Sequence, residues 1–166
     1  MNVIIIGCGR VGGFLAGLLD GAGHAVTVID LDRGSFVHLP PDFKGTTLLG
    51  SGIDMEILRQ AGVETTDALL GLTEGDNRNL MAAQIAHEIF GVKRVIAKVN
   101  DPIRARLYRE RGITTFSRTT ILGTLLEAML AGDAEVGKIL VERALEHEAE
   151  LAGLAPAGAG ASRAGR

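Results

Sequence analysis

The stretch Asn2-Val3-Ile4-Ile5-Ile6-Gly7-Cys8-Gly9-Arg10-Val11-Gly12 decides the fold of this chain. Its first five residues include an apolar run without polar alternation, which is typical of a strand buried on both faces of a parallel sheet. A G-x-G-x-x-G loop follows and leads into a helical pattern. In such a loop Gly7 permits a tight turn, Gly9 lets the backbone approach a pyrophosphate, and Gly12 lets the helix pack closely on the strand. The stretch therefore predicts the first βα unit of a nucleotide-binding sheet.

Short β-rich runs alternate with helical stretches as far as residue 116. The six predicted strands are Asn2–Ile6, Ala25–Asp30, Thr46–Leu49, Asp67–Leu72, Arg94–Val99 and Ile113–Phe116. Polar residues that can begin helices lie between them: Asp54 before Met55–Ala61, Asp76 or Asn77 before a helix to about Phe90, and Asp101 before Pro102. This alternation predicts an α/β fold, a Rossmann-like doubly wound six-stranded parallel sheet with strand order 3-2-1-4-5-6.

The pattern changes after residue 116. A helix over 119–130 carries a repeating apolar stripe, and two alternatives remain for it: packing on its own domain, or burial against another subunit. Residues 132–151 are predicted to form a helical extension, although 138–141 would also suit a short strand. Residues 152–166 are rich in Ala and Gly and are predicted to be a disordered tail.

Composition narrows the class of protein. The chain has 166 residues, which suits one domain, and its net charge of −3 gives no overall attraction to nucleic acid or anionic lipid. No run of about 20 apolar residues is present to span a membrane, and the first residues do not resemble a secretory signal. The single cysteine, Cys8, excludes an internal disulfide and a cysteine-built metal site. We expect a cytoplasmic protein with no nucleic-acid partner.

Asp30 supplies the acidic partner of the glycine loop. It lies 18 residues after Gly12, at the carboxyl end of the second predicted strand. A carboxylate at this place can accept hydrogen bonds from both hydroxyls of an adenosine ribose and would repel a 2′-phosphate. The loop and Asp30 together predict binding of NAD or an adenine nucleotide rather than NADP.

Two residues of the loop have open alternatives. Arg10 either reaches phosphate oxygens as a bidentate donor or is a solvated arginine in the first helical turn. Cys8 is either a small apolar filler or a redox group, and the N-terminus of the helix would lower the pKa of its thiol. Asp32 and Arg33, just after the second strand, either extend the adenosine pocket or begin a helix.

The ends of the fourth and fifth strands give further candidates. Thr73 and Glu74 lie at the sheet edge where ligands of open α/β sheets bind. Asp76 and Asn79 either cap the following helix or contact the distal part of a nucleotide. Lys98 either meets a phosphate or an acid across the cleft, or is solvated.

These motifs together resemble a known family. The resemblance is carried by five segments: G-C-G-R-V-G, V-I-D-L-D-R, L-L-G-S-G-I-D-M-E-I-L-R-Q-A-G-V, D-A-L-L-G-L-T-E-G-D-N-R-N-L and V-I-A-K-V-N-D-P. Together they are similar to the N-terminal nucleotide-binding (RCK, TrkA-N) domain of Trk/Ktr-type potassium-uptake regulators. The resemblance covers about Met1–Leu130. It implies a regulatory, non-enzymatic subunit that binds NAD(H) or ATP/ADP and gates a membrane K⁺ translocating subunit from the cytoplasmic face of the membrane.

The resemblance also implies roles for particular residues. Gly7–Val11 would hold phosphates, Asp30 the ribose, and Thr73 and Glu74 the adenosine side, while Lys98 stands where the family often has a basic residue. Helix 119–130 would be the crossover helix through which the chain forms a homodimer or a larger ring.

Three departures from the family pattern stand out. Ser51-Gly52 replaces the common Gly-Asp, which weakens the expectation of a contact there. Ser117-Arg118-Thr119 lacks an acid that helps to hold a cation in some members, so we expect no divalent metal. Members of full length continue into a second ligand-binding domain, and no role for such a domain is carried over.

Two alternative functions compete with the regulator: an NAD-dependent oxidoreductase, and a nucleotide-sensing fragment with no transport partner. An oxidoreductase would need an acid/base group near the nicotinamide. None of the four histidines (His24, His38, His87, His147) falls at the carboxyl end of a predicted strand, and Tyr108 has no lysine four positions later. The sequence therefore favours a regulator over an enzyme.

Overall fold

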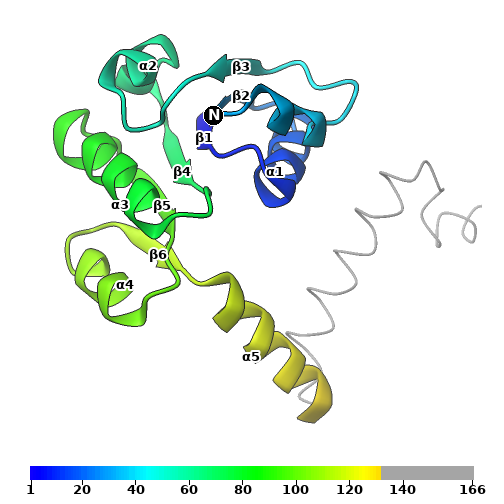
Figure 1. Ribbon diagram of the computed structural model, residues 1–166, viewed down its shortest axis with the longest axis vertical. Helices are drawn as coiled ribbons and strands as arrows, with labels where there is room; N and C mark the ends of the chain where they lie inside the picture. Colours follow the sequence, from blue (N-terminus) through cyan, green and yellow to red (C-terminus); the bar gives the residue numbers. More distant parts are fainter. Residues whose placement is uncertain (132–166) are drawn as a thin grey trace, which may run out of the picture. The chain divides into compact units, whose positions relative to one another are not determined.

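A six-stranded parallel sheet forms the centre of the protein. The computed structural model describes residues 1–131, and its first compact unit is Met1–Arg118. The strands are β1 (Asn2–Ile6), β2 (Ala25–Asp30), β3 (Thr46–Leu49), β4 (Ala68–Gly71), β5 (Arg94–Lys98) and β6 (Thr114–Phe116). Their order is β3-β2-β1-β4-β5-β6 (Figure 1), which confirms the predicted topology. β1 pairs with both β2 and β4, so the glycine loop lies at the point where the strand order reverses.

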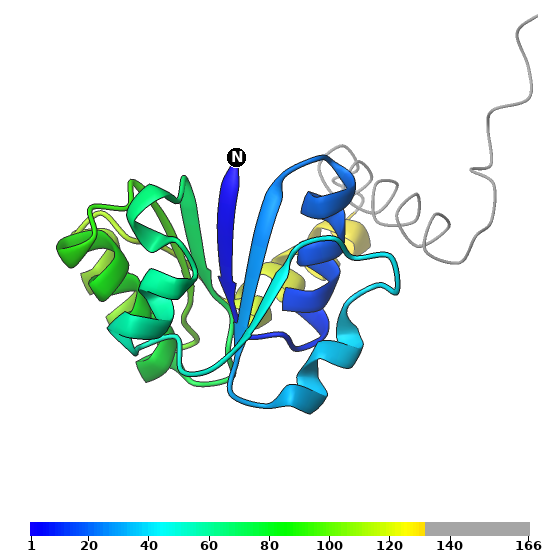
Figure 2. The same cartoon turned by 90° about the horizontal axis from the view of Figure 1, so that it is seen from above.

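Helices cover both faces of this sheet. They are α1 (Arg10–Gly21), the 3₁₀ helix η1 (Arg33–His38), α2 (Met55–Gln60), the 3₁₀ turn η2 (Val63–Thr65), α3 (Asp76–Gln84), the π-helix η3 (Ile85–Ile89) and α4 (Pro102–Arg109). Figure 2 shows α1 and η1 on one face, with α2, α3 and α4 on the other. This two-sided cover is why the strands are apolar on both faces.

β1 contributes to two separate hydrophobic cores. Ile4 and Ile6 belong to the core beneath α2, α3 and α4, whereas Val3 and Ile5 belong to the core beneath α1. All four side chains are at most 4% exposed. The apolar run in the sequence is explained by this double burial, because successive side chains of a strand point to opposite faces.

The predicted starts of two helices are confirmed. The Asp54 carboxylate accepts a hydrogen bond from the amide of Glu56 at 2.8 Å and caps α2. The Asp101 carboxylate accepts hydrogen bonds from the amides of Ile103 and Arg104, and Pro102 occupies the first position of α4. Both helices are thus bounded by local sequence signals.

The helix after β4 differs from its prediction in two ways. It begins at Asp76, but its N-cap is Gly75, with no side-chain cap. From Ile85 it continues as the π-helix η3, in which the amide of Phe90 bonds the carbonyl of Ile85. The predicted capping role of Asp76 and Asn79 is therefore wrong, and both side chains are used elsewhere.

The last described element is α5 (Arg118–Ala131), which continues into the second compact unit. Its bounds agree with the predicted helix 119–130. The predictions for 132–151 and 152–166 lie outside the described residues. Within residues 1–131, no helix combines the length and the apolar composition needed to cross a bilayer.

Candidate functional site

A crevice of about 210 Å³ opens at the carboxyl ends of β1, β2 and β4. Its floor is formed by Ile6, Gly7 and Gly9, its sides by residues that follow β2, β3 and β4. A second, smaller pocket of about 110 Å³ lies on the other side of the loop and shares Gly9, Leu72 and Glu74 with the first. The two pockets therefore adjoin along the glycine loop, at the edge where ligands of open α/β sheets bind.

The three glycines of the loop have three different surroundings. Gly7 has a φ of +103°, and a Cβ at this residue would lie 2.9 Å from the amide nitrogen of Thr73. A Cβ at Gly12 would overlap the carbonyl oxygen of Gly7, whereas one at Gly9 would meet nothing within 4 Å. The roles predicted for Gly7 in the turn and Gly12 in helix packing are confirmed. The space beside Gly9 is open to a ligand.

Asp30 connects the loop to the second strand. One oxygen of its carboxylate accepts a hydrogen bond from the amide of Cys8 at 2.6 Å, and the other accepts one from the amide of Asp32 at 2.9 Å. The carboxylate also lines the larger crevice. Asp30 is thus at the place predicted for a ribose acceptor, and it fixes the position of the loop as well.

Cys8 is fully buried in the core beneath α1. Burial, with a smaller contribution from the Asp30 carboxylate, raises the pKa of the Cys8 thiol to about 11. The alternative of a lowered thiol pKa is therefore wrong, because burial of the thiol raises its pKa. Of the two alternatives for Cys8, the small apolar filler is the one that this burial supports.

Asp32 begins a helix, as one of its two predicted alternatives requires. Its carboxylate accepts a hydrogen bond from the amide of Gly34 at 2.9 Å and caps η1, whose first residue is Arg33. Asp32 is absent from the lining of either described pocket, while Leu31 and Ser35 on its two sides line the larger one. A contact between Asp32 and a nucleotide stays a prediction.

The loop after β3 contributes more than the sequence indicated. Gly50, Ser51, Gly52 and Ile53 all line the larger crevice. A Cβ at Gly52 would overlap the side chain of Ile6, so glycine is needed for this loop to reach the end of β1. The missing acid in Ser51-Gly52 therefore does not remove the loop from the site.

Asn79 organises the loop after β4. It is fully buried, and its side-chain oxygen accepts hydrogen bonds from the amide and the hydroxyl of Thr73 at 2.9 and 2.7 Å. Its side-chain nitrogen donates to the carbonyls of Thr73 and Lys98, both at 2.9 Å. Asn79 therefore positions Thr73 in the crevice and ties the end of β4 to the end of β5.

Asp76, near the surface, makes a second connection between the start of α3 and the residues after β5. Its carboxylate accepts hydrogen bonds from the amides of Asn100 and Asp101 at 2.9 and 3.0 Å. Asp76 and Asn79 are thus not caps of α3, and their hydrogen bonds direct them away from the distal part of a ligand. They hold the start of α3 to the end of β5 and to the residues that follow it.

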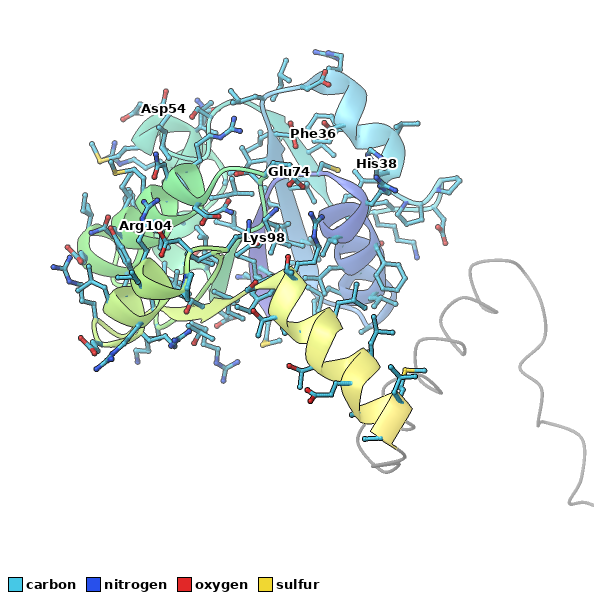
Figure 3. The ribbon with its side chains drawn as sticks, turned by 60° about the horizontal axis from the view of Figure 1, so that its bottom comes forward. Phe36, His38, Asp54, Glu74, Lys98 and Arg104 are labelled. Carbon is cyan, nitrogen blue, oxygen red and sulfur yellow. The ribbon has the colours of Figure 1, made fainter. Side chains whose placement is uncertain are left out.

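Four charged side chains surround the smaller pocket: Arg10, Glu74, Lys98 and Arg118. Lys98 Nζ lies 3.2 Å from Glu74 Oε2, and Arg118 Nη1 lies 3.8 Å from Glu74 Oε1. Figure 3 shows Glu74 and Lys98 close together beside the N-terminal end of α1. Of the alternatives for Lys98, the ion pair with an acid across the cleft is the one observed.

The hydrogen bond and the charge of Lys98 hold the pKa of Glu74 below its usual value. Arg118 and Arg10 act more weakly in the same direction, and slight burial acts against them. Arg10 also lines the smaller pocket together with Val11 and Gly12. A contact of Arg10 with phosphate stays a prediction, but its position at the pocket is established.

Sequence reasoning missed two arginines of the site. Arg78, in the first turn of α3, lines the larger crevice, and Arg118, just after β6, lines the smaller pocket. In the sequence, the stretch that contains Arg118 is distinguished only by the lack of an acid. The position of each at the carboxyl edge of the sheet is the signal that could have identified them. In residues 1–131 no three His, Cys, Asp or Glu side chains gather closely enough to hold a metal ion.

Comparison with known proteins identifies relatives of this chain. The family described as "TrkA-N domain" matches residues 3–118. The "Trk system potassium uptake protein TrkA" of Streptomyces coelicolor is 46% identical over 115 residues, which are 69% of this chain and 52% of that protein. The chain thus spans about half the length of this curated relative.

Two solved structures share the fold at lower identity. The "Kef CTD in AMP bound form" of Shewanella denitrificans is 22% identical with a TM-score of 0.64, over 91% of this chain and 94% of that one. The "GsuK channel bound to NAD" is 21% identical with a TM-score of 0.61, over 74% of this chain and 22% of that one. These likenesses support the fold assignment.

Proposed function

This chain belongs to the TrkA-N domain family, and from this membership we propose that it is a nucleotide-binding regulatory component of a Trk-type potassium uptake system. The crevice binds the adenosine part of NAD(H) or of ATP/ADP. Its occupancy then changes the affinity of the chain for a membrane K⁺ translocating subunit. A ligand can shift such an equilibrium only by the difference in its affinity for the two states.

The single observation that carries the proposal is the arrangement of Gly9 and Asp30 around the crevice. Gly9 leaves open space beside the backbone at the start of α1, where unpaired amides and the helix dipole attract phosphate. Asp30 lines the same crevice and has lone pairs beyond its two amide contacts. A nucleotide can therefore place its phosphates beside Gly9 and its ribose beside Asp30.

The ligands of the two related folds are consistent with this proposal. AMP and NAD share an adenosine monophosphate part. Leu31 and Ile53, which are both exposed, provide apolar surface in the crevice for a base. The proposal therefore commits to the adenosine part of the ligand.

A regulatory role is favoured over an oxidoreductase by the surroundings of the histidines. In the described part of the chain, the ring nitrogens of His38 and His87 contact the carbonyls of Ser35 and Val92, and His24 lies 3.4 Å from the N-terminal amine. None of these three lines either described pocket. An acid/base catalyst must lie within hydrogen-bond reach of the reacting group.

In this proposal the chain acts in the cytoplasm and reaches the inner face of the membrane through its transport partner. It assembles with other copies through helix 119–130. Co-purification of a Trk-type membrane subunit with the chain, with and without ADP or NADH, tests the partnership. The proposal requires that nucleotide change the amount retained. Equal retention in all samples, or none, contradicts it.

A matched pair of glycine substitutions tests nucleotide binding at the loop. Gly9→Ala fits the free protein, at a cost of about 1 kcal/mol or less as an N-cap change, but its methyl group occupies the space needed by phosphate. Gly12→Ala places a methyl group on the Gly7 carbonyl and lowers the stability of the fold itself.

Thermal denaturation distinguishes these two effects. A nucleotide at about 100 times its Kd adds about 2.7 kcal/mol of stability, or several degrees in Tm. We expect this shift for the wild-type protein and its loss in Gly9→Ala, whose Tm without ligand stays near that of wild type. An undiminished shift in Gly9→Ala would falsify binding at the loop.

A further inference from the structure

The two adjoining pockets carry opposite electrostatic character. The larger crevice is lined by two carboxylates, Asp30 and Glu74, and one cation, Arg78, and the Asp30 carboxylate suits hydroxyl groups. The smaller pocket has three cationic side chains, Arg10, Lys98 and Arg118, and one carboxylate, Glu74. Its surplus of positive charge suits an anion that approaches along the loop.

Lys98 is the buried member of this group. Its side chain is only 6% exposed, and its ammonium lies 3.2 Å from Glu74 Oε2. A buried ammonium needs a close anion, since removing such a charge from water is costly without a partner. Glu74 supplies that anion.

Glu74 itself is held loosely. Its side chain is 76% exposed, and it belongs to the short connection between β4 and α3. One of its oxygens faces Lys98 and the other faces Arg118 at 3.8 Å. An exposed carboxylate of this kind can rotate into water at little cost, so its place beside Lys98 is open to a stronger anion.

We propose that Glu74 is an internal substitute for a ligand phosphate: in the ligand-free chain it occupies Lys98 and Arg118, and a phosphoryl group beyond the first phosphate of an adenine nucleotide displaces it. This inference rests on the proposed function, because the adenosine part must lie in the larger crevice. ADP, ATP and NAD(H) all carry such a phosphoryl group, whereas AMP does not.

The exchange gives the loop after β4 two states. With Glu74 on Lys98, the loop is tied to β5 by an ion pair, in addition to the hydrogen bonds of Asn79. With phosphate on Lys98, the Glu74 carboxylate faces solvent with a full negative charge. When a second phosphate binds to Lys98, the Glu74 side chain is therefore released at the surface of the protein.

Calorimetric titration with inorganic pyrophosphate, AMP and ADP tests the exchange. Glu74→Gln removes the competing charge, and we expect about tenfold tighter binding of pyrophosphate and ADP, with less than twofold change for AMP. Glu64→Gln is the matched control, since Glu64 is also an exposed acid paired with an arginine, at 3.8 Å from Arg59. Arg118→Gln should weaken pyrophosphate and ADP severalfold.

A shorter acid separates displacement from simple charge repulsion. Glu74→Asp keeps the charge but reaches less far toward Lys98, so pyrophosphate should bind more tightly to this variant than to wild type. Wild-type affinity in Glu74→Asp, unchanged or weaker binding in Glu74→Gln, or an equal gain for AMP would each overturn the exchange.

The same titrations distinguish a failure of this inference from a failure of the proposed function. If AMP binds but the Glu74 variants do not alter pyrophosphate binding, the exchange is wrong and the adenosine site stands. If pyrophosphate responds as expected but AMP and ADP bind no better than pyrophosphate, the adenosine site is wrong and the anion pocket stands. Absence of binding by all three overturns both.

Discussion

Asp30 and Glu74 are two carboxylates at the same edge of the sheet with different surroundings. Asp30 accepts hydrogen bonds from two backbone amides and is fixed in place by the chain around it. Glu74 forms its ion pairs with two side chains, Lys98 and Arg118, and is largely exposed. The first therefore suits recognition of a constant part of a ligand, and the second suits a contact that can be exchanged.

The pH dependence of stability should report the Glu74 ion pair. Because the pKa of Glu74 is lower in the folded protein than its ordinary value of 4.5, the pair stabilises the fold above about pH 4.5. This contribution is lost as the pH falls through the folded-state pKa. Urea unfolding of wild type and Glu74→Gln should therefore differ at pH 7 and converge toward pH 3. A gap that persists or widens in acid contradicts this assignment.

Cys8 should behave as an inert thiol. Its pKa of about 11 is above the ordinary 9.0, so the neutral thiol stabilises the fold below pH 9, and this contribution is lost as the pH rises through about 11. Iodoacetamide at pH 8 should leave Cys8 unmodified in the folded protein and alkylate it readily in urea, as followed by mass spectrometry. Rapid alkylation of the folded protein would refute the burial.

Single-residue roles were predictable where the cause is local. The positions of Gly7 and Gly12 follow from the loop spacing, and the cap at Asp54 follows from its neighbours along the chain. The sequence does not identify the partner of Lys98, because Glu74 follows β4 whereas Lys98 ends β5. The pKa of Cys8 depends on burial, which a position at a helix start does not reveal.

At the scale of elements, α3 is fixed at its start by hydrogen bonds that cross between loops. Asn79 was expected to cap this helix or contact ligand, because those are the roles that adjacent sequence suggests. Its bond to the Lys98 carbonyl exists only because β4 and β5 are neighbours in the sheet. The strands β1, β2 and β3 have the predicted bounds, whereas β4, β5 and β6 are shorter by one or two residues.

Replacing Asn79 should destabilise the whole sheet edge. Asn79→Ala leaves the amide of Thr73 and the carbonyl of Lys98 without their partner in a buried place, at a cost of about 2–4 kcal/mol. Asn77→Ala, on the exposed side of the same helix, loses one surface bond to Arg104 and should cost less than about 1 kcal/mol. Equal midpoints of urea unfolding for the two variants would contradict the structural role of Asn79.

At the scale of the whole molecule, α5 is the element proposed to join copies of the chain. Its apolar residues recur at helical spacing: Ile121, Leu122, Leu125, Leu126, Met129 and Leu130. The sequence predicted this helix but left its packing open, since the same stripe suits a partner subunit or the chain's own domain.

Oligomeric state tests the role of α5. The double variant Leu122→Asp with Leu126→Asp places two charges on the apolar stripe and should reduce the mass of the assembly to that of one chain. Thr124→Asp, on the opposite side of the helix, should leave the assembly intact. Sedimentation equilibrium measures both, and an unchanged mass in the double variant would exclude pairing through α5.

The central claim is that the crevice between the glycine loop and Asp30 holds the adenosine part of a nucleotide. Calorimetric titration of AMP into wild type, Asp30→Ala and Asp20→Ala tests it most directly. We predict one AMP per wild-type chain, at least tenfold weaker binding to Asp30→Ala, and binding near that of wild type for Asp20→Ala, whose carboxylate accepts a hydrogen bond from the amide of Lys44 at the C-terminal end of α1 and is outside the lining of both described pockets. No heat with wild type, or equal affinity for Asp30→Ala, would contradict the account.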